Sequence, residues 1–188
     1  MDHHDDRIVP WTVTGRREVY RNRIFGITAA EARSPNPGPA PGTFFRLECD
    51  GWVNVLARTS DRRYVFVEQY RHGTDAVTLE IPGGLIDPGE EPLAAAIREL
   101  REESGYTGRA SILGSVEPNP AIQNNTCWTA LVEDVERVGD LLLDHHEEIA
   151  VHLVPELEVV QMIRSGRITH SLVIAAFALI WAQEGVPR

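Results

Sequence analysis

Three carboxylates on one short stretch of chain are the residues best suited to do chemistry. Glu99, Glu102 and Glu103 stand three and four residues apart, so on a helix they project from neighbouring points of one face. Like charges at these spacings repel by roughly 0.2–0.5 kcal/mol per pair, and near the C-terminal end of a helix the dipole disfavours them further. Local stability therefore does not explain the cluster. Because clustered hard oxygen ligands suit Mg²⁺ or Mn²⁺, the spacing indicates a divalent cation site.

A helix from about Pro92 to Gly105 is predicted to carry these carboxylates. Proline is tolerated in the first helical turn, the three alanines that follow are strong helix formers, and Gly105 can end the helix in a left-handed conformation. Leu93, Ile97 and Leu100 recur at i, i+4 and i+7, which predicts a buried stripe. We expect the carboxylate face to lie well away from this stripe and to face an open cleft.

The residues around this helix form a long motif that ends at Tyr106. From Gly84 it reads Gly, five residues, Glu, seven residues, Arg-Glu-aliphatic-X-Glu-Glu-X-Gly-aromatic. A solvated acidic helix is the alternative for three glutamates alone, but it does not account for the glycine turn before the helix. The motif resembles the Nudix box of nucleoside diphosphate hydrolases at every defined position. The resemblance implies a Nudix α/β/α sandwich with a mixed sheet, and an enzyme that hydrolyses phosphoanhydride bonds.

Within that family the chain looks most like the branch of ADP-ribose pyrophosphatases and nucleoside-diphosphate-sugar hydrolases. Residues 67–71 and 79–84 are close to the branch's Gln-Tyr-Arg strand and its Leu-Glu-Ile-Pro-Ala-Gly segment, and Pro120 follows the last glycine of the box by fifteen residues. Gly83 replaces the usual alanine, and residues 118–125 differ from the segment of dedicated ADP-ribose enzymes. The implied substrate is ADP-ribose or a nucleotide sugar, cleaved to a nucleoside monophosphate and a sugar phosphate, with the preference open.

The resemblance also implies a metal site. Glu99 and Glu103 would be the leading metal ligands, with Glu102 as a shared ligand. The backbone carbonyl of Gly83 would complete the site, and glycines at 83 and 84 let the backbone turn toward the metal. The implied cofactor is Mg²⁺, for which Mn²⁺ can substitute.

Arg98 and Glu90 are expected to orient other groups. By resemblance they form a salt bridge that holds the loop and the helix in register. Arg98 also stands four residues before Glu102, a spacing at which the two side chains pair on a helix. The alternative is a plain surface pair.

The general base is expected outside the box. In this branch it often comes from a mobile acidic loop, and residues 144–148 (Asp-His-His-Glu-Glu) form an acidic run before a predicted strand. Glu147 aligns best with the family pattern, Glu148 comes next, and Glu102 is a further candidate. The alternative is a solvated loop. The expected catalytic residues are thus Glu147, Glu102 and Arg98.

Arg71 and Glu80 are the expected substrate-binding residues. In the resembling enzymes they flank the cleft and help to hold phosphate and ribose. A guanidinium that donates two parallel hydrogen bonds suits phosphate. The alternative is that Arg71 is a surface residue at a strand end.

Composition limits the partners. The net charge is −10 and all 18 basic residues are arginine, so binding to nucleic acid across a broad surface is disfavoured. The apolar run at 172–181 is too short to span a bilayer. Cys49 and Cys127 are isolated and indicate neither a disulfide framework nor a zinc site. With no signal-peptide pattern at the start, we expect a cytoplasmic protein whose partner is a small nucleoside diphosphate substrate, without nucleic acid or membrane.

The elements that must position these residues fall into two parts. An antiparallel strand layer is predicted at 8–14, 18–29 and 43–49. Its apolar content is too thin to stand alone, and in the resembling branch this segment mediates a domain-swapped homodimer. We therefore expect an N-terminal strand segment at 1–48 for dimerisation and a hydrolase domain at 49–188.

The hydrolase domain is predicted to be a mixed sheet with helices on both faces, because strands, a helix, further strands and then helices follow one another. The predicted strands are 53–57, 64–70, 78–82, 111–116, 126–132 and 149–154, and the predicted later helices are 155–165 and 170–183.

Two other functions stay open. One is a pyrophosphatase for dinucleotides such as NADH or for mRNA caps, although the acidic charge and the lack of a basic stripe weigh against RNA. The other is a sensor that binds ADP-ribose without hydrolysing it. Such sensors usually have a damaged box and an attached helix-turn-helix, whereas this box is intact.

Overall fold

The structure, a computed structural model, describes residues 8–187. Its chain contacts divide it into two compact units. The first runs to Asp50 and also includes Asn119–Asn125, and the second comprises Gly51–Pro118 and the chain from Thr126 onward. In the part of the chain that is described, no helix has the length and apolar character needed to cross a membrane.

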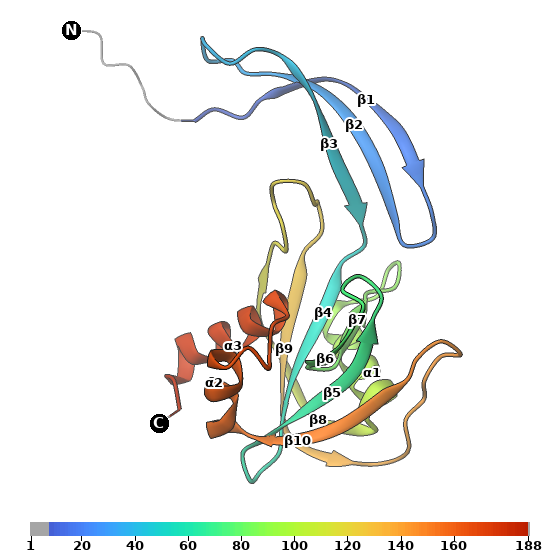
Figure 1. The fold of residues 1–188 in the computed structure, drawn as a ribbon, viewed down its shortest axis with the longest axis vertical. Helices are drawn as coiled ribbons and strands as arrows, with labels where there is room; N and C mark the ends of the chain where they lie inside the picture. Colours follow the sequence, from blue (N-terminus) through green and yellow to red (C-terminus); the bar gives the residue numbers. More distant parts are fainter. Residues whose placement is uncertain (1–7, 188) are drawn as a thin grey trace, which may run out of the picture. The chain divides into compact units, whose positions relative to one another are not determined.

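The first unit is a three-stranded antiparallel sheet in the order β1-β2-β3 (Figure 1). Its strands are β1 (Thr12–Arg21), β2 (Phe25–Arg33) and β3 (Gly42–Cys49).

The two strands predicted before residue 30 are wrong in their bounds. Strand β1 continues through residues 15–17, where the sequence predicts a break between two strands. The chain turns instead at Asn22, whose Oδ1 accepts hydrogen bonds of 2.8 Å from the N–H groups of both Ile24 and Phe25. An asparagine that bonds to the backbone two residues on makes its own turn. The flanking strand-forming residues hide this signal in the sequence.

The second unit is built on a mixed sheet of seven strands. The main path runs β10-β5-β4-β9-β8, while β6 pairs with β5 and β7 pairs with β4. Strands β4 and β9 are parallel and the other pairs are antiparallel. The strands are β4 (Trp52–Arg58), β5 (Arg63–Arg71), β6 (Ala76–Glu80), β7 (Gly83–Leu85), β8 (Tyr106–Val116), β9 (Cys127–Arg137) and β10 (Ile149–Pro155).

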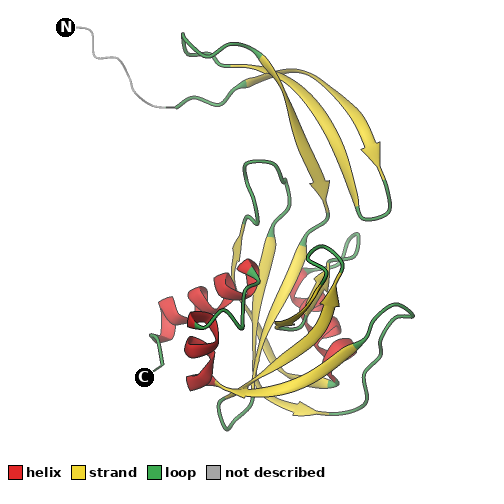
Figure 2. Cartoon of the chain, in the orientation of Figure 1, coloured by secondary structure: helices red, strands yellow, loops and turns green. Residues whose placement is uncertain are grey.

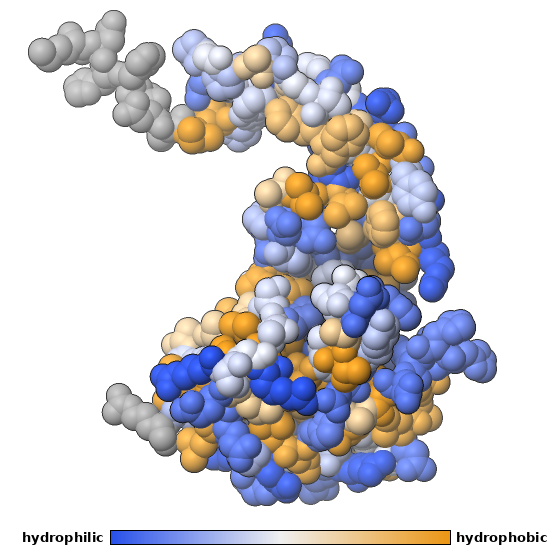
Figure 3. Space-filling view, viewed as in Figure 1, coloured by the Kyte–Doolittle hydropathy of each residue, from blue (hydrophilic) through white to orange (hydrophobic). Residues whose placement is uncertain are grey.

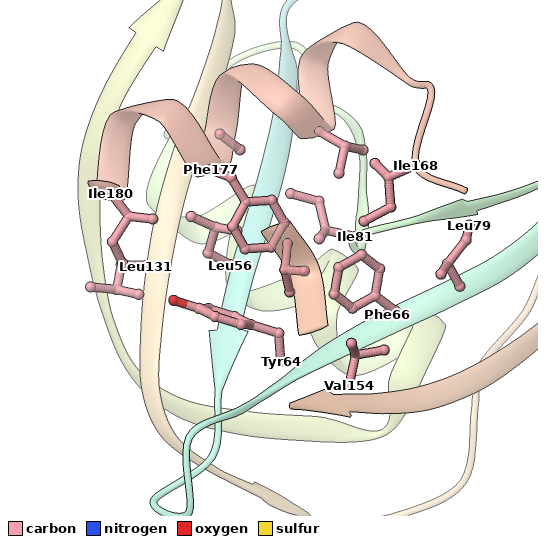
Figure 4. Close-up of a cluster of buried hydrophobic side chains, with 13 residues drawn as sticks. Leu56, Tyr64, Phe66, Leu79, Ile81, Leu131, Val154, Ile168, Phe177 and Ile180 are labelled. Atoms are coloured by element: carbon pink, nitrogen blue, oxygen red, sulfur yellow. The ribbon is translucent and has the colours of Figure 1, made fainter. Parts of the chain in front are cut away.

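Three helices cover this sheet within the described residues: α1 (Pro92–Ser104), α2 (Glu156–Arg164) and α3 (Ser171–Glu184). On one face of the sheet, Ala95 and Leu100 of α1 pack in one cluster with Val53 of β4. The other face packs α2 and α3, and the ring of Phe177 lies 5.1 Å from that of Tyr64 in a T-shaped contact (Figures 2 and 4). The predicted α/β/α sandwich is therefore confirmed.

Some strands of the second unit differ from their predicted bounds. β8 begins directly after α1 rather than at residue 111, and β9 continues to Arg137. β7 was not predicted as a strand, because its two glycines read as part of a turn.

Helix α1 begins and ends as predicted, with Pro92 in its first turn and Gly105 at a φ of 75°. Its buried face is different. Ile97 is 41% exposed, and the buried residues are Ala95, Ala96, Leu100, Glu103 and Ser104. Small alanines let the helix approach the sheet more closely than a stripe of large side chains would. The carboxylates therefore do not all lie away from the buried face, because Glu103 belongs to it.

Candidate active site

Arg98 joins the glycine turn to helix α1. Its Nε donates to Glu90 Oε1 at 3.0 Å and its Nη2 to Glu90 Oε2 at 2.8 Å. Nη2 also reaches the carbonyl of Leu85 at 3.0 Å. Hydrogen bonds from this guanidinium hold the pKa of Glu90 below its usual range. The salt bridge that the motif implied is present, and it fixes the loop against the helix.

The same guanidinium contacts two carboxylates of the acidic cluster. Its Nη1 donates to Glu99 Oε1 at 2.8 Å and to Glu102 Oε2 at 3.1 Å. The side chain of Glu102 is 38% exposed, whereas that of Glu99 is 14% exposed. Arg98 thus orients one half-buried carboxylate and one that is more exposed.

Glu103 is the most deeply placed of the three carboxylates, at 5% exposure. Its Oε2 accepts a hydrogen bond of 2.9 Å from the backbone N–H of Gly83. Burial raises the pKa of Glu103 to about 8, and the negative charges of Glu99 and Glu147 add to this effect. A buried carboxylate with one neutral donor is a group whose charged form needs a cation.

Gly83 and Gly84 bring the backbone of β7 close to this cluster. A Cβ on Gly84 would overlap the carboxylate of Glu99, and a Cβ on Gly83 would overlap the carbonyl oxygen of Val53. Close approach to backbone therefore requires glycine at 83, whereas a side chain at 84 would displace the carboxylate of Glu99. Burial also raises the pKa of Glu99, against the opposing effect of Arg98.

The donor set fits a hard divalent cation, although within residues 8–187 no three His, Cys, Asp or Glu side chains are gathered tightly enough to form a ready-made cage. Burial raises the pKa values of Glu99 and Glu103 and outweighs the opposing effects of Arg98 on Glu99 and of the Gly83 N–H on Glu103, so their charged forms are only partly compensated. Oxygen ligands of this kind suit Mg²⁺ or Mn²⁺.

Glu147 lies in the exposed loop before β10. Its Oε2 accepts a hydrogen bond of 2.9 Å from the N–H of Asp144, and its own N–H donates to the Asp144 carbonyl at 3.1 Å. Burial is the largest cause of the raised pKa of Glu99 and of Glu103, and the negative charge of Glu147 adds to both. Glu148 is also exposed.

Arg71 and Glu80 bind one another. Arg71 Nε donates to Glu80 Oε1 at 2.9 Å and Nη2 donates to Oε2 at 2.8 Å, while the Thr78 hydroxyl donates to Oε1 at 2.6 Å. Burial of Glu80 acts to raise its pKa, but the hydrogen bonds from Arg71 and Thr78 outweigh burial and lower it. The hydrogen bonds to Glu80 raise the pKa of Arg71, and the negative charges of Glu103 and Glu147 add to this effect. Because Glu80 stands three positions before Gly83, whose N–H donates to Glu103, the pair borders the acidic cluster.

His170 is a neighbour of this pair that the sequence motifs did not indicate. Its Nε2 lies 3.9 Å from Glu80 Oε2. The only local signal is its position directly before an apolar helix, which is typical of a helix cap.

Comparison with known proteins agrees with the fold and the motif. A family model described as NUDIX domain matches residues 51–177. The chain is 28% identical to an ADP-ribose pyrophosphatase of Mycobacterium tuberculosis, over 87% of this chain and 80% of the relative. It is 26% identical to a methanol dehydrogenase activator of Bacillus methanolicus, over 90% of this chain and 91% of that relative. A crystal structure of an ADP compounds hydrolase superposes with a TM-score of 0.82 at 20% identity, covering 96% of this chain and 99% of that one, and shows the likeness of fold.

Proposed function

The chain belongs to the Nudix hydrolase family, and from this premise we propose that it cleaves the diphosphate of a nucleoside diphosphate linked to a sugar. ADP-ribose or a nucleotide sugar would give a nucleoside monophosphate and a sugar phosphate. The observation that carries the proposal is the contact of buried Glu103 with Gly83 beside a desolvated Glu99, because it places two carboxylates at the glycine turn. Similarity over most of the chain to a protein named as an ADP-ribose pyrophosphatase supports the substrate class.

Glu99, Glu103 and Glu102 would hold Mg²⁺ or Mn²⁺, with the carbonyl of Gly83. When bound, the cation supplies positive charge against the diphosphate. Arg98 keeps Glu99 and Glu102 oriented and ties them to the loop through Glu90.

Glu147 would take the proton from the attacking water. It is exposed and its side chain is held by its own loop, so it can move toward a bound substrate without breaking the fold. Glu102, the exposed carboxylate of the cluster, is the next candidate for this role.

A dinucleotide pyrophosphatase is the second candidate. A relative named for a different role, the methanol dehydrogenase activator, is as similar to this chain as the named ADP-ribose pyrophosphatase. Similarity at this level therefore does not distinguish a sugar from a second nucleoside as the group attached to the diphosphate. A sensor without hydrolysis is less well supported, because every carboxylate of the box is retained.

We also propose that the protein is a cytoplasmic homodimer, formed through an N-terminal segment at 1–48, with the hydrolase domain at 49–188. Among the described residues of the first unit, Ala29 and Ala32 are the buried hydrophobic residues, so this sheet has little core of its own. Apolar side chains instead lie on its surface (Figure 3), and several line a hollow of about 690 Å³: Trp11, Val13, Phe44, Phe45 and Ile122. A second copy would cover this face symmetrically.

A screen with added alkaline phosphatase tests the proposed reaction, because the phosphatase frees inorganic phosphate from the monophosphate products but not from the intact diphosphates. The substrates are ADP-ribose, nucleotide sugars, NADH and dinucleoside polyphosphates, each with Mg²⁺ and with EDTA. We expect the highest kcat/KM for a nucleoside diphosphate sugar, with no turnover in EDTA. A preference for NADH or a dinucleoside polyphosphate would favour the second candidate, and turnover of none of them would refute the proposal.

A further inference from the structure

A group of three polar side chains borders the acidic cluster without belonging to it. Glu80 is 3% exposed and accepts two hydrogen bonds from Arg71 and one from Thr78. His170 approaches the same carboxylate from the loop before α3, with Nε2 at 3.9 Å from Oε2. This separation is too long for a hydrogen bond, so His170 is near Glu80 but is not engaged by it.

The position of His170 fixes which ring nitrogen carries the proton. Its Nδ1 accepts a hydrogen bond of 3.2 Å from the N–H of Leu172 and so caps helix α3. In a neutral imidazole with Nδ1 as the acceptor, Nε2 is the N–H donor. The ring therefore presents a donor beside Glu80, and the side chain is 34% exposed.

The remaining hydrogen-bonding capacity of the group mixes donors and acceptors. Glu80 Oε2 accepts from Arg71 Nη2 alone and keeps a free lone pair, while Arg71 Nη1 makes no hydrogen bond among the residues described. His170 Nε2 adds a further donor. The charge of Arg71 is neutralised by the carboxylate that it binds, and a phosphate placed here would meet the negative charge of Glu80. A hydroxyl group suits these partners better, because it donates to Glu80 and accepts from Arg71 or His170.

We propose that His170 is a specificity-determining residue, whose Nε2 donates to a hydroxyl group of the substrate's sugar beside the Arg71–Glu80 pair. This inference rests on the proposed function and names the part of the substrate that this group of side chains binds. Glu80 stands three positions before Gly83, whose N–H donates to Glu103, so the sugar would lie next to the diphosphate at the acidic cluster. The hydroxyls belong either to the sugar released as its phosphate or to the ribose of the nucleoside.

Binding of small probes tests this assignment without any turnover. The affinities of ribose 5-phosphate, AMP and inorganic phosphate are measured by calorimetry in Mg²⁺ for the unaltered protein and for His170→Asn. Asparagine is a good helix cap, so it keeps the acceptor for Leu172 while removing the donor that faces Glu80. His152→Asn is the matched control, because His152 is another partly exposed histidine beside a carboxylate, with Nε2 at 3.3 Å from Glu68.

The unaltered protein is expected to prefer at least one sugar phosphate over inorganic phosphate. His170→Asn should weaken that affinity about five- to tenfold, the scale of one lost hydrogen bond to a neutral group, and leave inorganic phosphate and the thermal midpoint unchanged. Loss for ribose 5-phosphate alone assigns the group to the released sugar, and loss for AMP alone assigns it to the nucleoside. An equal loss for inorganic phosphate, no loss for either sugar, or no initial preference for a sugar would overturn the proposal. Normal sugar binding without turnover in the substrate screen would instead refute only the proposed reaction.

Discussion

The carboxylate of Glu103 accepts a hydrogen bond of 2.9 Å from the backbone N–H of Gly83, across twenty positions of the chain. This contact ties the last turn of α1 to β7, which itself pairs with β4 in the central sheet. The buried end of the acidic cluster is therefore held by the main sheet and not by the helix alone. Rigid support of this kind is what a site that positions a metal and a diphosphate requires.

Metal removal should separate activity from folding. Without a cation the acidic cluster offers no positive charge to a diphosphate, so EDTA should abolish hydrolysis and Mg²⁺ or Mn²⁺ should restore it. Because a cation that binds the folded state stabilises it, Mg²⁺ should also raise the thermal midpoint of the substrate-free protein. Full turnover in EDTA would contradict the metal-dependent proposal.

Glu103→Gln should lower kcat by at least about two orders of magnitude, the scale expected when a transition-state charge loses a stabilising partner. Glutamine keeps an acceptor for the Gly83 N–H and removes a buried charge, so the free energy of unfolding should be unchanged or slightly higher. The Mg²⁺-induced rise in thermal midpoint should shrink in parallel. Glu158→Gln, on the exposed side of α2, is the control that should alter neither kcat nor the Mg²⁺-induced rise in thermal midpoint. Normal specific activity with impaired folding would assign Glu103 a structural role.

Acid stability should depend on an ion pair outside the box, between Arg58 and Glu184. Hydrogen bonds of 2.6 and 2.9 Å from Arg58 hold the pKa of Glu184 below its ordinary value of 4.5. A carboxylate with a lowered pKa contributes stability above its unfolded pKa and loses that contribution as the pH falls through its folded pKa. Glu184→Gln should therefore unfold more easily than the unaltered protein above about pH 5, and the difference should disappear in stronger acid. Urea denaturation at several pH values measures this, and a difference independent of pH would exclude the ion pair as its cause.

The homodimer should depend on the exposed aromatic face of the first unit. Phe44 is 49% exposed, so Phe44→Asp removes apolar contact area without opening a core. Light scattering at micromolar concentration should give a dimer mass for the unaltered protein and a monomer mass for this variant. Tyr70→Asp is the control, because Tyr70 is also 49% exposed but lies in the second unit. A monomer mass for the unaltered protein would reject the dimer.

The sequence predicts the parts of this protein in which local chemistry decides the structure. Pro92 and Gly105 bound a helix by their own backbone preferences, and the spacing of Arg98 and Glu102 requires only that the helix forms. The prediction of the buried face of α1 is wrong, because that face depends on how closely the helix approaches β4. The small side chains of Ala95 and Ala96 permit a close approach.

Contacts between distant segments are the part of the site that the sequence does not reveal. The pairing of Arg71 with Glu80 follows from the register of β5 with β6, where Arg71 lies opposite Ala76 and Val67 lies opposite Glu80. The approach of His170 to Glu80 needs the loop before α3 to return to the same edge of the sheet. No spacing pattern encodes that return, because the two residues are ninety positions apart.

The final prediction separates the general base from the metal ligands. Glu147 is exposed outside the box helix, and its side chain is held by the Asp144 N–H at 2.9 Å. A base that moves onto a bound substrate affects the chemical step more than affinity. Glu147→Gln should therefore lower kcat strongly while KM and Mg²⁺ affinity stay nearly unchanged, and Glu148→Gln, its exposed neighbour, should be the milder variant. Steady-state kinetics and calorimetric Mg²⁺ titration of both variants measure these effects. Weakened Mg²⁺ binding in Glu147→Gln would make Glu147 a ligand instead. An unchanged kcat in both variants would move the role to Glu102, the exposed carboxylate that Arg98 already orients at 3.1 Å.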